Sequence, residues 1–242
     1  MTERKAILVM GAGDATGGAI AKRFAREGYV ACVARRHADK LAPLVAAIET
    51  AGGTARAFGC DARVEAEVIE LFASIEREVG PLEAVVFNIG ANVQFSITET
   101  TERVYRKVWE MAALAGFLTG REAAKVMLPR ARGSIIFTGA TASLRGRANF
   151  SAFASAKFAL RALAQSMARE LGPQGIHVAH PIIDGAIDTA FIRESFPELY
   201  QRKEQDGILN PEHIAETYWQ IHCQPRDCWV HELDLRPWTE TF

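Results

Sequence analysis

The stretch Ala6-Ile-Leu-Val-Met-Gly-Ala-Gly-Asp-Ala-Thr-Gly-Gly18 decides the fold. Its first five residues are continuously apolar, which is typical of a parallel strand buried on both faces. A helical pattern follows the glycines, with Ile20 and Phe24 four residues apart on one face. Glycine lets a backbone approach a pyrophosphate closely, and a helix N-terminus supplies free N–H groups. The stretch therefore predicts the phosphate loop of a βαβ dinucleotide-binding unit. A glycine-rich turn without a ligand is the alternative.

The rest of the chain repeats this alternation of apolar runs and helical patterns. Further strands are expected at 29–34, 54–60, 84–88, 134–138, 177–183 and 229–235. Helices are expected at 19–27, 41–50, 65–79, 102–128 and 153–171. Strand–helix–strand order without a linker or a solenoid repeat predicts a Rossmann-type, doubly wound parallel α/β sheet. We expect one domain over residues 1–242.

Composition excludes several classes of protein. Apolar residues make up 49% and charged residues 24% of the 242, which excludes a disordered chain. With 28 basic and 29 acidic residues the formal charge is −1, so neither nucleic acid nor a membrane is expected as a partner. The apolar run Ala6–Met10 is too short for a signal peptide, and four cysteines are too few for a disulfide scaffold. We expect a cytoplasmic protein.

The end of the second predicted strand indicates which nucleotide binds. A NAD site usually has a carboxylate there for the ribose 2′-hydroxyl, whereas NADP needs a cation for its 2′-phosphate. Here the strand ends in Ala34-Arg35-Arg36-His37, and the first carboxylate is Asp39. A guanidinium fits phosphate geometry, so NADPH is predicted in preference to NADH. The alternative is a solvated charge pair on an exposed turn.

Residues 188–210 break the alternation. They contain Phe191, Phe196 and Tyr200, and they follow the carboxyl end of a strand, where ligands of such sheets bind. A substrate lid with an apolar or aromatic wall is predicted, and with it an apolar or aromatic small-molecule substrate. An ordinary pair of surface helices is the alternative.

Short motifs also stand at the ends of the predicted strands. They are Asp61, Phe87-Asn-Ile-Gly90, and Asp184-Gly185 followed by Ile187 and Thr189. With the glycine loop, they make the chain resemble the short-chain dehydrogenase/reductase family over residues 6 to about 189. Two fixed positions of the family's loop are altered, at Met10 and Ala15. The resemblance implies a cofactor site made of Gly11, Asp14, Thr16, Gly17, Arg35, Arg36, Asp61, Ala62, Asn88, Gly90, Lys157, Ile187 and Thr189.

The resemblance also locates the catalytic positions. The family uses a Tyr-x-x-x-Lys pair, a serine and an asparagine. Lys157 matches the lysine, but the tyrosine position is Phe153, the serine position Ala140 and the asparagine position Ala112. The tyrosine position of the enoyl-reductase variant is Phe150. Since positioned acid–base groups contribute roughly 10²–10⁴ in rate, the resemblance implies a non-standard catalytic site.

Other polar residues near these positions are candidate replacements. They are Thr141, Ser143, Asn92, Gln94 and Asp184. Asp184 stands where the family has proline, beside the expected nicotinamide, and a partly desolvated carboxyl group can hold and donate a proton. We expect Lys157 and Asp184 to be catalytic. The alternatives are a solvent-facing lysine and an aspartate that caps a turn.

The C-terminal region contains two His/Cys pairs, His222-Cys223 and Cys228 with His231. Both residue types bind zinc, but the spacing is loose and an apolar strand follows, so no metal is expected. The tail at 233–238 is an interface candidate or a docked terminus. A homodimer or homotetramer is implied by the resemblance, through the helices at 102–128 and 153–171.

Two functions remain open. The first is an NADP(H)-dependent oxidoreductase with a non-standard catalytic site and an unknown substrate. The second is a non-catalytic NADP(H)-binding sensor, scaffold or partner subunit, which the changes at Ala112, Ala140 and Phe153 favour. Fold alone does not choose between them.

Overall fold

The structure is a computed structural model and describes residues 5–240. In this range one sheet has eight strands in the order β3-β2-β1-β4-β5-β7-β6, and β8 also pairs with β7. Every strand pair is parallel. The strands are β1 Ala6–Met10, β2 Val30–Arg35, β3 Thr54–Gly59, β4 Leu82–Phe87, β5 Gly133–Phe137, β6 Gly139–Ala140, β7 Ile176–Ile183 and β8 Glu232–Leu235. The predicted doubly wound α/β fold is confirmed.

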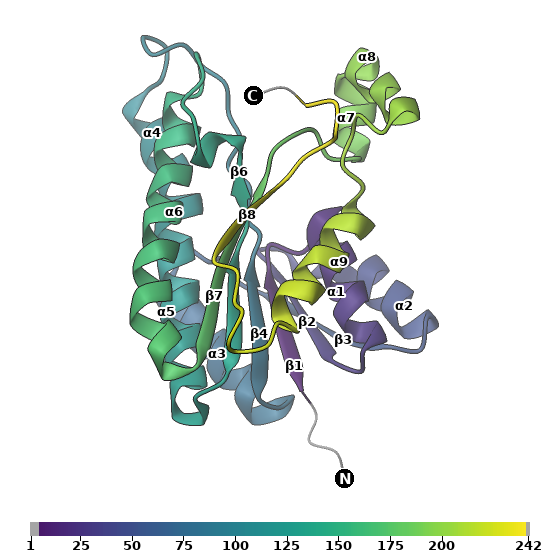
Figure 1. The fold of residues 1–242 in the computed structure, drawn as a ribbon, viewed down its shortest axis with the longest axis vertical. Coiled ribbons are helices and arrows are strands. Elements are labelled where there is room, and N and C mark those ends of the chain that lie inside the picture. Colours follow the sequence, from purple (N-terminus) through teal and green to yellow (C-terminus); the bar gives the residue numbers. More distant parts are fainter. Residues whose placement is uncertain (1–4, 241–242) are drawn as a thin grey trace.

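Helices cover both faces of the sheet (Figure 1). They are α1 Thr16–Arg26, α2 Ala42–Thr50, α3 Glu65–Glu78, α4 Glu102–Trp109, α5 Ala115–Met127, α6 Ser151–Leu171, α7 Ala190–Ser195, α8 Pro197–Tyr200 and α9 Pro211–His222. Phe72 of α3, Leu118 of α5 and Leu160 of α6 pack into one core cluster. Phe24 of α1 and Tyr218 of α9 belong to the cluster on the opposite face. No helix in residues 5–240 is both long and apolar enough to cross a membrane.

Three elements differ from the sequence prediction. The expected helix at 102–128 widens into a π-helix at Glu110–Leu114, between α4 and α5. The last strand is shorter than 229–235 and is limited to Glu232–Leu235. Helix α9 was not predicted, although Asn210 caps it by accepting from the Glu212 N–H at 2.9 Å and Pro211 occupies its first turn. Both features are ordinary helix-start signals.

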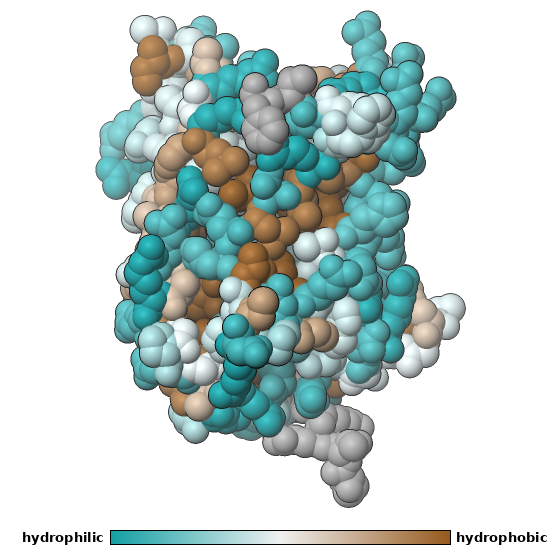
Figure 2. All heavy atoms as spheres, viewed as in Figure 1, coloured by the Kyte–Doolittle hydropathy of each residue, from teal (hydrophilic) through white to brown (hydrophobic). Residues whose placement is uncertain are grey.

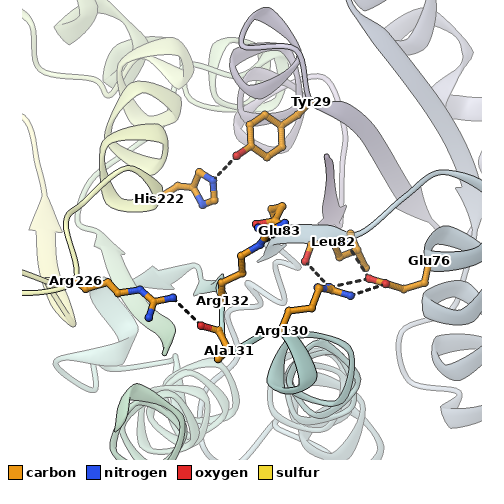
Figure 3. Close-up of polar contacts among 9 residues, drawn as sticks. All are labelled: Tyr29, Glu76, Leu82, Glu83, Arg130, Ala131, Arg132, His222 and Arg226. Atoms are coloured by element: carbon orange, nitrogen blue, oxygen red, sulfur yellow. Dashed lines mark hydrogen bonds and ion pairs between the residues drawn. The ribbon is translucent and has the colours of Figure 1, made fainter. Parts of the chain in front are cut away.

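The amino ends of the strands are held together by polar contacts (Figure 3). Arg130 donates to both carboxylate oxygens of Glu76 and to the Leu82 carbonyl. Arg132 pairs with Glu83, whose side chain is 9% exposed. These ion pairs lie opposite the carboxyl ends of the strands. They therefore stabilise the end of the sheet where an α/β fold does not place its ligand.

Candidate functional site

Two adjoining cavities open at the carboxyl ends of the strands. Their volumes are about 320 Å³ and 900 Å³, and both are lined by the phosphate loop and by residues 88–90. Every residue that the sequence assigned to the cofactor lies on one of the two walls. The smaller cavity has Arg35, Arg36, Asp61 and Ala62; the larger has Thr16, Gly17, Lys157, Ile187 and Thr189; both have Gly11, Asp14, Asn88 and Gly90.

The phosphate loop has the shape that a pyrophosphate requires. Gly11 has φ +89°, and a Cβ there would lie 2.8 Å from the Asn88 carbonyl oxygen, so a side chain is excluded. A Cβ on Gly13 would meet no atom within 4 Å, so this part of the loop faces open space. Helix α1 has no side-chain cap and no acidic residue in its first turn. Its free N–H groups therefore remain available to an anion.

The smaller cavity is rich in guanidinium groups. Its wall includes Arg35, Arg36 and Arg63, whereas Asp39 does not reach it. Neither the Arg35 nor the Arg36 guanidinium forms a hydrogen bond or ion pair with another described side chain. Asp61 accepts from Arg63 at 2.9 Å and 2.6 Å, and these hydrogen bonds hold the pKa of the Asp61 carboxyl below its usual value. Unpaired guanidinium groups suit a phosphate monoester.

Lys157 lies in the larger cavity on α6. Its side chain is buried, and its Nζ donates to the Thr138 carbonyl oxygen at 2.9 Å. Burial lowers the pKa of Lys157 to about 8. Thr138 is held from the other side as well, because Tyr218 of α9 donates to its Oγ1 at 2.9 Å. The predicted placement of Lys157 at the cavity is therefore what the structure has, and the alternative of a solvent-facing lysine is wrong.

The surroundings of Lys157 are apolar. Phe150, Phe153 and Ala140 line the same cavity. Ala112 lies behind the wall, in a buried cluster with Ala152 and other small residues, and Phe153 packs against this cluster. None of these four side chains carries a proton that could move during catalysis.

A polar pair stands beside this apolar wall. Thr141 lines the larger cavity and its hydroxyl donates to Asp184 Oδ1 at 2.6 Å. Asp184 is 1% exposed and does not itself line the cavity. The Arg145 guanidinium lies 3.5 Å from Oδ1, and Asp184 Oδ2 is buried without a hydrogen-bond partner in residues 5–240. The Asp184 carboxyl is therefore connected to the cavity by its hydrogen bond with the Thr141 hydroxyl, which lines the wall.

The remaining candidate proton donors are Asn92, Gln94 and Ser143, and they differ in whether they line the larger cavity. Asn92 lines the larger cavity, whereas Gln94 does not. Ser143 is fully buried and its Oγ accepts from the Ala140 N–H at 3.1 Å, which closes the short turn after β6. Ser143 is thus a turn residue, and Thr141 is the hydroxyl that lines the cavity.

The segment 188–210 forms α7, α8 and a 3₁₀ turn at Gln201–Gln205. Thr189, Leu199 and Arg202 from this segment line the larger cavity. The aromatic wall expected from Phe191, Phe196 and Tyr200 is not found. Phe191 and Phe196 pack edge to face on each other at 5.7 Å and remain 64% and 47% exposed. The aromatic surface comes instead from Phe150 and Phe153.

His222 of the C-terminal region lies between two hydroxyl groups. His222 Nε2 lies 2.8 Å from the Tyr29 hydroxyl, the contact drawn in Figure 3, and its Nδ1 lies 2.9 Å from Ser134 Oγ. Burial lowers the pKa of His222 to about 4, so the ring is neutral at pH 7. Within residues 5–240 no three His, Cys, Asp or Glu side chains are grouped so that they could hold a metal ion.

Several residues of the wall had no sequence signal. Arg145 and Arg147 come from a loop and Glu240 from the C-terminal tail, whereas Arg202 belongs to the predicted lid segment. No motif or periodicity marks residues in such a loop or tail, so only the folded chain brings them to the cavity.

Comparison with known proteins agrees with this geometry. Residues 5–199 match the family described as short chain dehydrogenase. The chain belongs to this family. A short-chain dehydrogenase from Rhodopseudomonas palustris has 50% sequence identity and a TM-score of 0.84, with 97% of this chain and 99% of that chain covered.

Two further relatives extend the comparison. The short-chain reductase protein NovJ from Streptomyces niveus is 31% identical over 234 residues, which cover 90% of this chain and 86% of that protein. An alcohol dehydrogenase from Thermococcus sibiricus, solved with 5-hydroxy-NADP, has a TM-score of 0.87, 24% identity and 99% coverage of both chains. This last likeness concerns the fold alone.

Proposed function

We propose that this member of the short chain dehydrogenase family is an oxidoreductase that uses NADP(H), with NADPH preferred over NADH. The observation that carries the proposal is the pair of unpaired guanidinium groups, Arg35 and Arg36, on the wall of the smaller cavity. The uncapped N-terminus of α1 supports it, because it would take the pyrophosphate.

The residues present fit the cofactor. Gly11, Gly13 and Asn88 would hold the pyrophosphate region, Asp61 would face the adenine, and Lys157 the nicotinamide ribose. When bound, the cofactor supplies or accepts a hydride. The positive charge of Lys157, present below a pKa of about 8, would orient that half of the cofactor.

Proton transfer falls to Thr141 and Asp184 in this proposal. During oxidation of an alcohol, the Thr141 hydroxyl would take the substrate proton while giving its own to Asp184 Oδ1. During reduction of a carbonyl the same protons would move in reverse, and the carbonyl oxygen would gain one. The 2.6 Å hydrogen bond supports this direction of transfer, since a Thr141 hydroxyl that donates to Asp184 presents its lone pairs to the cavity. Asp184 is then a positioning and proton-holding residue behind Thr141.

The site is non-standard in this proposal, because Phe153, Ala140 and Ala112 occupy the positions of the family's tyrosine, serine and asparagine. Their apolar packing supports this, as no hydroxyl lies on that part of the wall. The substrate is proposed to be a small molecule with an apolar or aromatic body, which Phe150 and Phe153 would contact.

The test compares Thr141→Val with Thr141→Ser in turnover of aryl ketones and the matching alcohols. Valine keeps the shape and removes the hydroxyl, so we expect a loss of roughly 10²-fold or more in kcat, whereas serine retains most activity. Asp184→Asn removes the carboxylate that accepts from the Thr141 hydroxyl, so it is expected to lower kcat for alcohol oxidation as well. NADPH affinity is expected to stay unchanged in all three variants. Equal activity of the valine variant and the wild type would contradict the role of Thr141.

The non-catalytic alternative predicts a different result. It expects NADPH binding without turnover of any substrate in the panel. In that case the double variant Phe153→Tyr with Ala140→Ser distinguishes two origins of the inactive site. Gain of carbonyl reduction would indicate a reductase site that lost its catalytic groups, and no gain would indicate a pocket rebuilt for binding.

A further inference from the structure

The mouth of the larger cavity has a charge that the proposed proton transfer does not use. Arg145, Arg147 and Arg202 line it together with Lys157, and the acidic side chains on its wall are Asp14 and Glu240. Basic side chains therefore outnumber acidic ones in this cavity, whereas the whole chain has a formal charge of −1. Such an excess attracts an anion to the cavity.

The three arginines differ in how far they are already engaged. Arg145 lies 3.5 Å from Asp184 and so belongs to the buried polar pair. Arg147 is exposed, and its side chain has no hydrogen bond or ion pair with any residue in the described part of the chain. Arg202 makes one long hydrogen bond, from Nη2 to Thr239 Oγ1 at 3.4 Å. Arg147 and Arg202 therefore keep most of their donors free.

A carboxylate already lies near Arg202. The Glu240 carboxylate oxygen is 3.8 Å from Arg202 Nη2, which is at the limit of an ion pair and too long for a hydrogen bond. Glu240 comes from the C-terminal tail and lines the same cavity. A ligand carboxylate that reached hydrogen-bond distance of the free guanidinium donors would replace this weak contact with a stronger one.

The neighbouring wall is apolar, since Phe150, Phe153, Ile183 and Leu199 line it. A ligand that contacts both the apolar wall and the arginines has an apolar or aromatic body and an anionic end. We propose that the substrate is a carboxylic acid of this kind, whose carboxylate is bound by Arg147 and Arg202 in competition with Glu240. The inference rests on the proposed function, because it names the substrate class of the same site.

The direct test is the binding of matched acids and amides to the full chain saturated with NADP⁺. The probes are 3-phenylpropanoate and 2-naphthoate, each with its primary amide, titrated by calorimetry. We expect each acid to bind about tenfold more tightly than its amide, since only the charged group forms charge-assisted hydrogen bonds. Equal affinity of acid and amide would overturn the proposal.

Variants assign the effect to named residues. Arg147→Gln and Arg202→Gln are expected to reduce acid affinity to the level of the amide and to leave amide affinity unchanged. Glu240→Gln is expected to tighten acid binding a fewfold, because the internal competitor loses its charge. Weaker acid binding by Glu240→Gln would contradict the competition. Arg56→Gln, an exposed arginine on the edge strand β3, is the matched control and should change nothing.

The same arginines could instead bind the phosphates of the cofactor. In that case Arg147→Gln and Arg202→Gln would weaken NADPH binding and preserve the ratio of acid to amide affinity, which would overturn the inference. Failure of the proposed function looks different. No nucleotide would then bind the wild type, and the comparison of acid and amide on the nucleotide-free chain would still decide whether the cavity selects an anion.

Discussion

Lys157 carries an amine into the protein interior, where its only described hydrogen bond is to the Thr138 carbonyl. Asp184 is a second buried ionisable group, and its Oδ2 lacks a hydrogen-bond partner in the described residues. Burial of such groups costs free energy, and both lie within or directly behind one cavity wall. Ionisable residues of this kind concentrate at functional sites, which is why we place the chemistry there.

The pKa of Lys157 predicts how stability depends on pH. Its pKa is lowered from 10.5 to about 8 in the folded chain, so between these values the unfolded chain holds a proton that the folded chain lacks. Stability therefore rises with pH across this window, while below about pH 8 the cost of burying the charge is constant. Relative to Lys157→Met, the wild type is expected to gain up to about 3 kcal/mol between pH 7 and pH 10.5.

Urea unfolding of both proteins at several pH values measures this difference. Comparison with Lys157→Met cancels the titration of other groups. A difference that stays constant from pH 7 to pH 10.5 would contradict the lowered pKa.

Elements rather than single residues bring the site together. Helix α1 presents its N-terminus to one part of it, α6 supplies Lys157, and the segment 188–210 contributes three residues to the wall of the larger cavity. Lys203 forms a 2.6 Å ion pair with Asp188, and a surface pair of this kind contributes little to stability. Helices α7 and α8 contain no buried residue, so this part of the segment can respond to a ligand.

Hydrogen exchange tests whether the segment acts as a lid. Because Leu199 and Arg202 line the cavity, a bound ligand would contact them, and we expect exchange at 190–209 to slow when NADPH and an aryl acid are both present. Residues 65–78 of α3 do not line the larger cavity and provide the internal control. Unchanged exchange at 190–209 would favour ordinary surface helices.

The two parts of the site differ in how well the sequence predicts them. The phosphate loop was predictable because its chemistry is contained in thirteen consecutive residues. Thr141 and Asp184 are 43 residues apart, and their contact depends on how the short 3₁₀ turn after β6, at residues 141–143, packs against the end of β7. Phe191 and Phe196 looked like wall residues by composition, yet they pack on each other because an adjacent aromatic partner was available. The first contact depends on tertiary packing between distant segments, and the second depends on how the segment 188–210 folds on itself.

At the scale of the whole molecule, several large hydrophobic residues are exposed on one group of helices. Tyr105, Trp109, Phe117 and Phe158 on α4, α5 and α6 are each 41–43% exposed. Hydrophobic residues also gather at the centre of the face shown in Figure 2, in the region of β8 and α9, and are bordered by hydrophilic ones. Apolar surface of this kind is characteristic of protein–protein interfaces.

We predict a homodimer or homotetramer that uses the surface of α4, α5 and α6. Replacing Phe117 and Phe158 by Glu is expected to shift the assembly to a smaller species, because it places charges in an apolar contact. Light scattering coupled to gel filtration measures the mass. Phe191→Glu, which changes a more exposed aromatic residue on the lid, is the control and should leave the mass unchanged. A wild-type monomer would contradict this prediction.

The central claim is that this family member binds NADP(H) through Arg35 and Arg36. The most direct measurement is a titration of the full chain with NADPH, NADH, NADP⁺ and NAD⁺, followed by nicotinamide fluorescence and by calorimetry. We expect NADPH to bind at least tenfold more tightly than NADH, and Arg35→Gln with Arg36→Gln to remove this preference while NADH affinity stays the same. Binding of NADH as tightly as NADPH would contradict the role of the two arginines, and binding of none of the four nucleotides would contradict the proposed function itself.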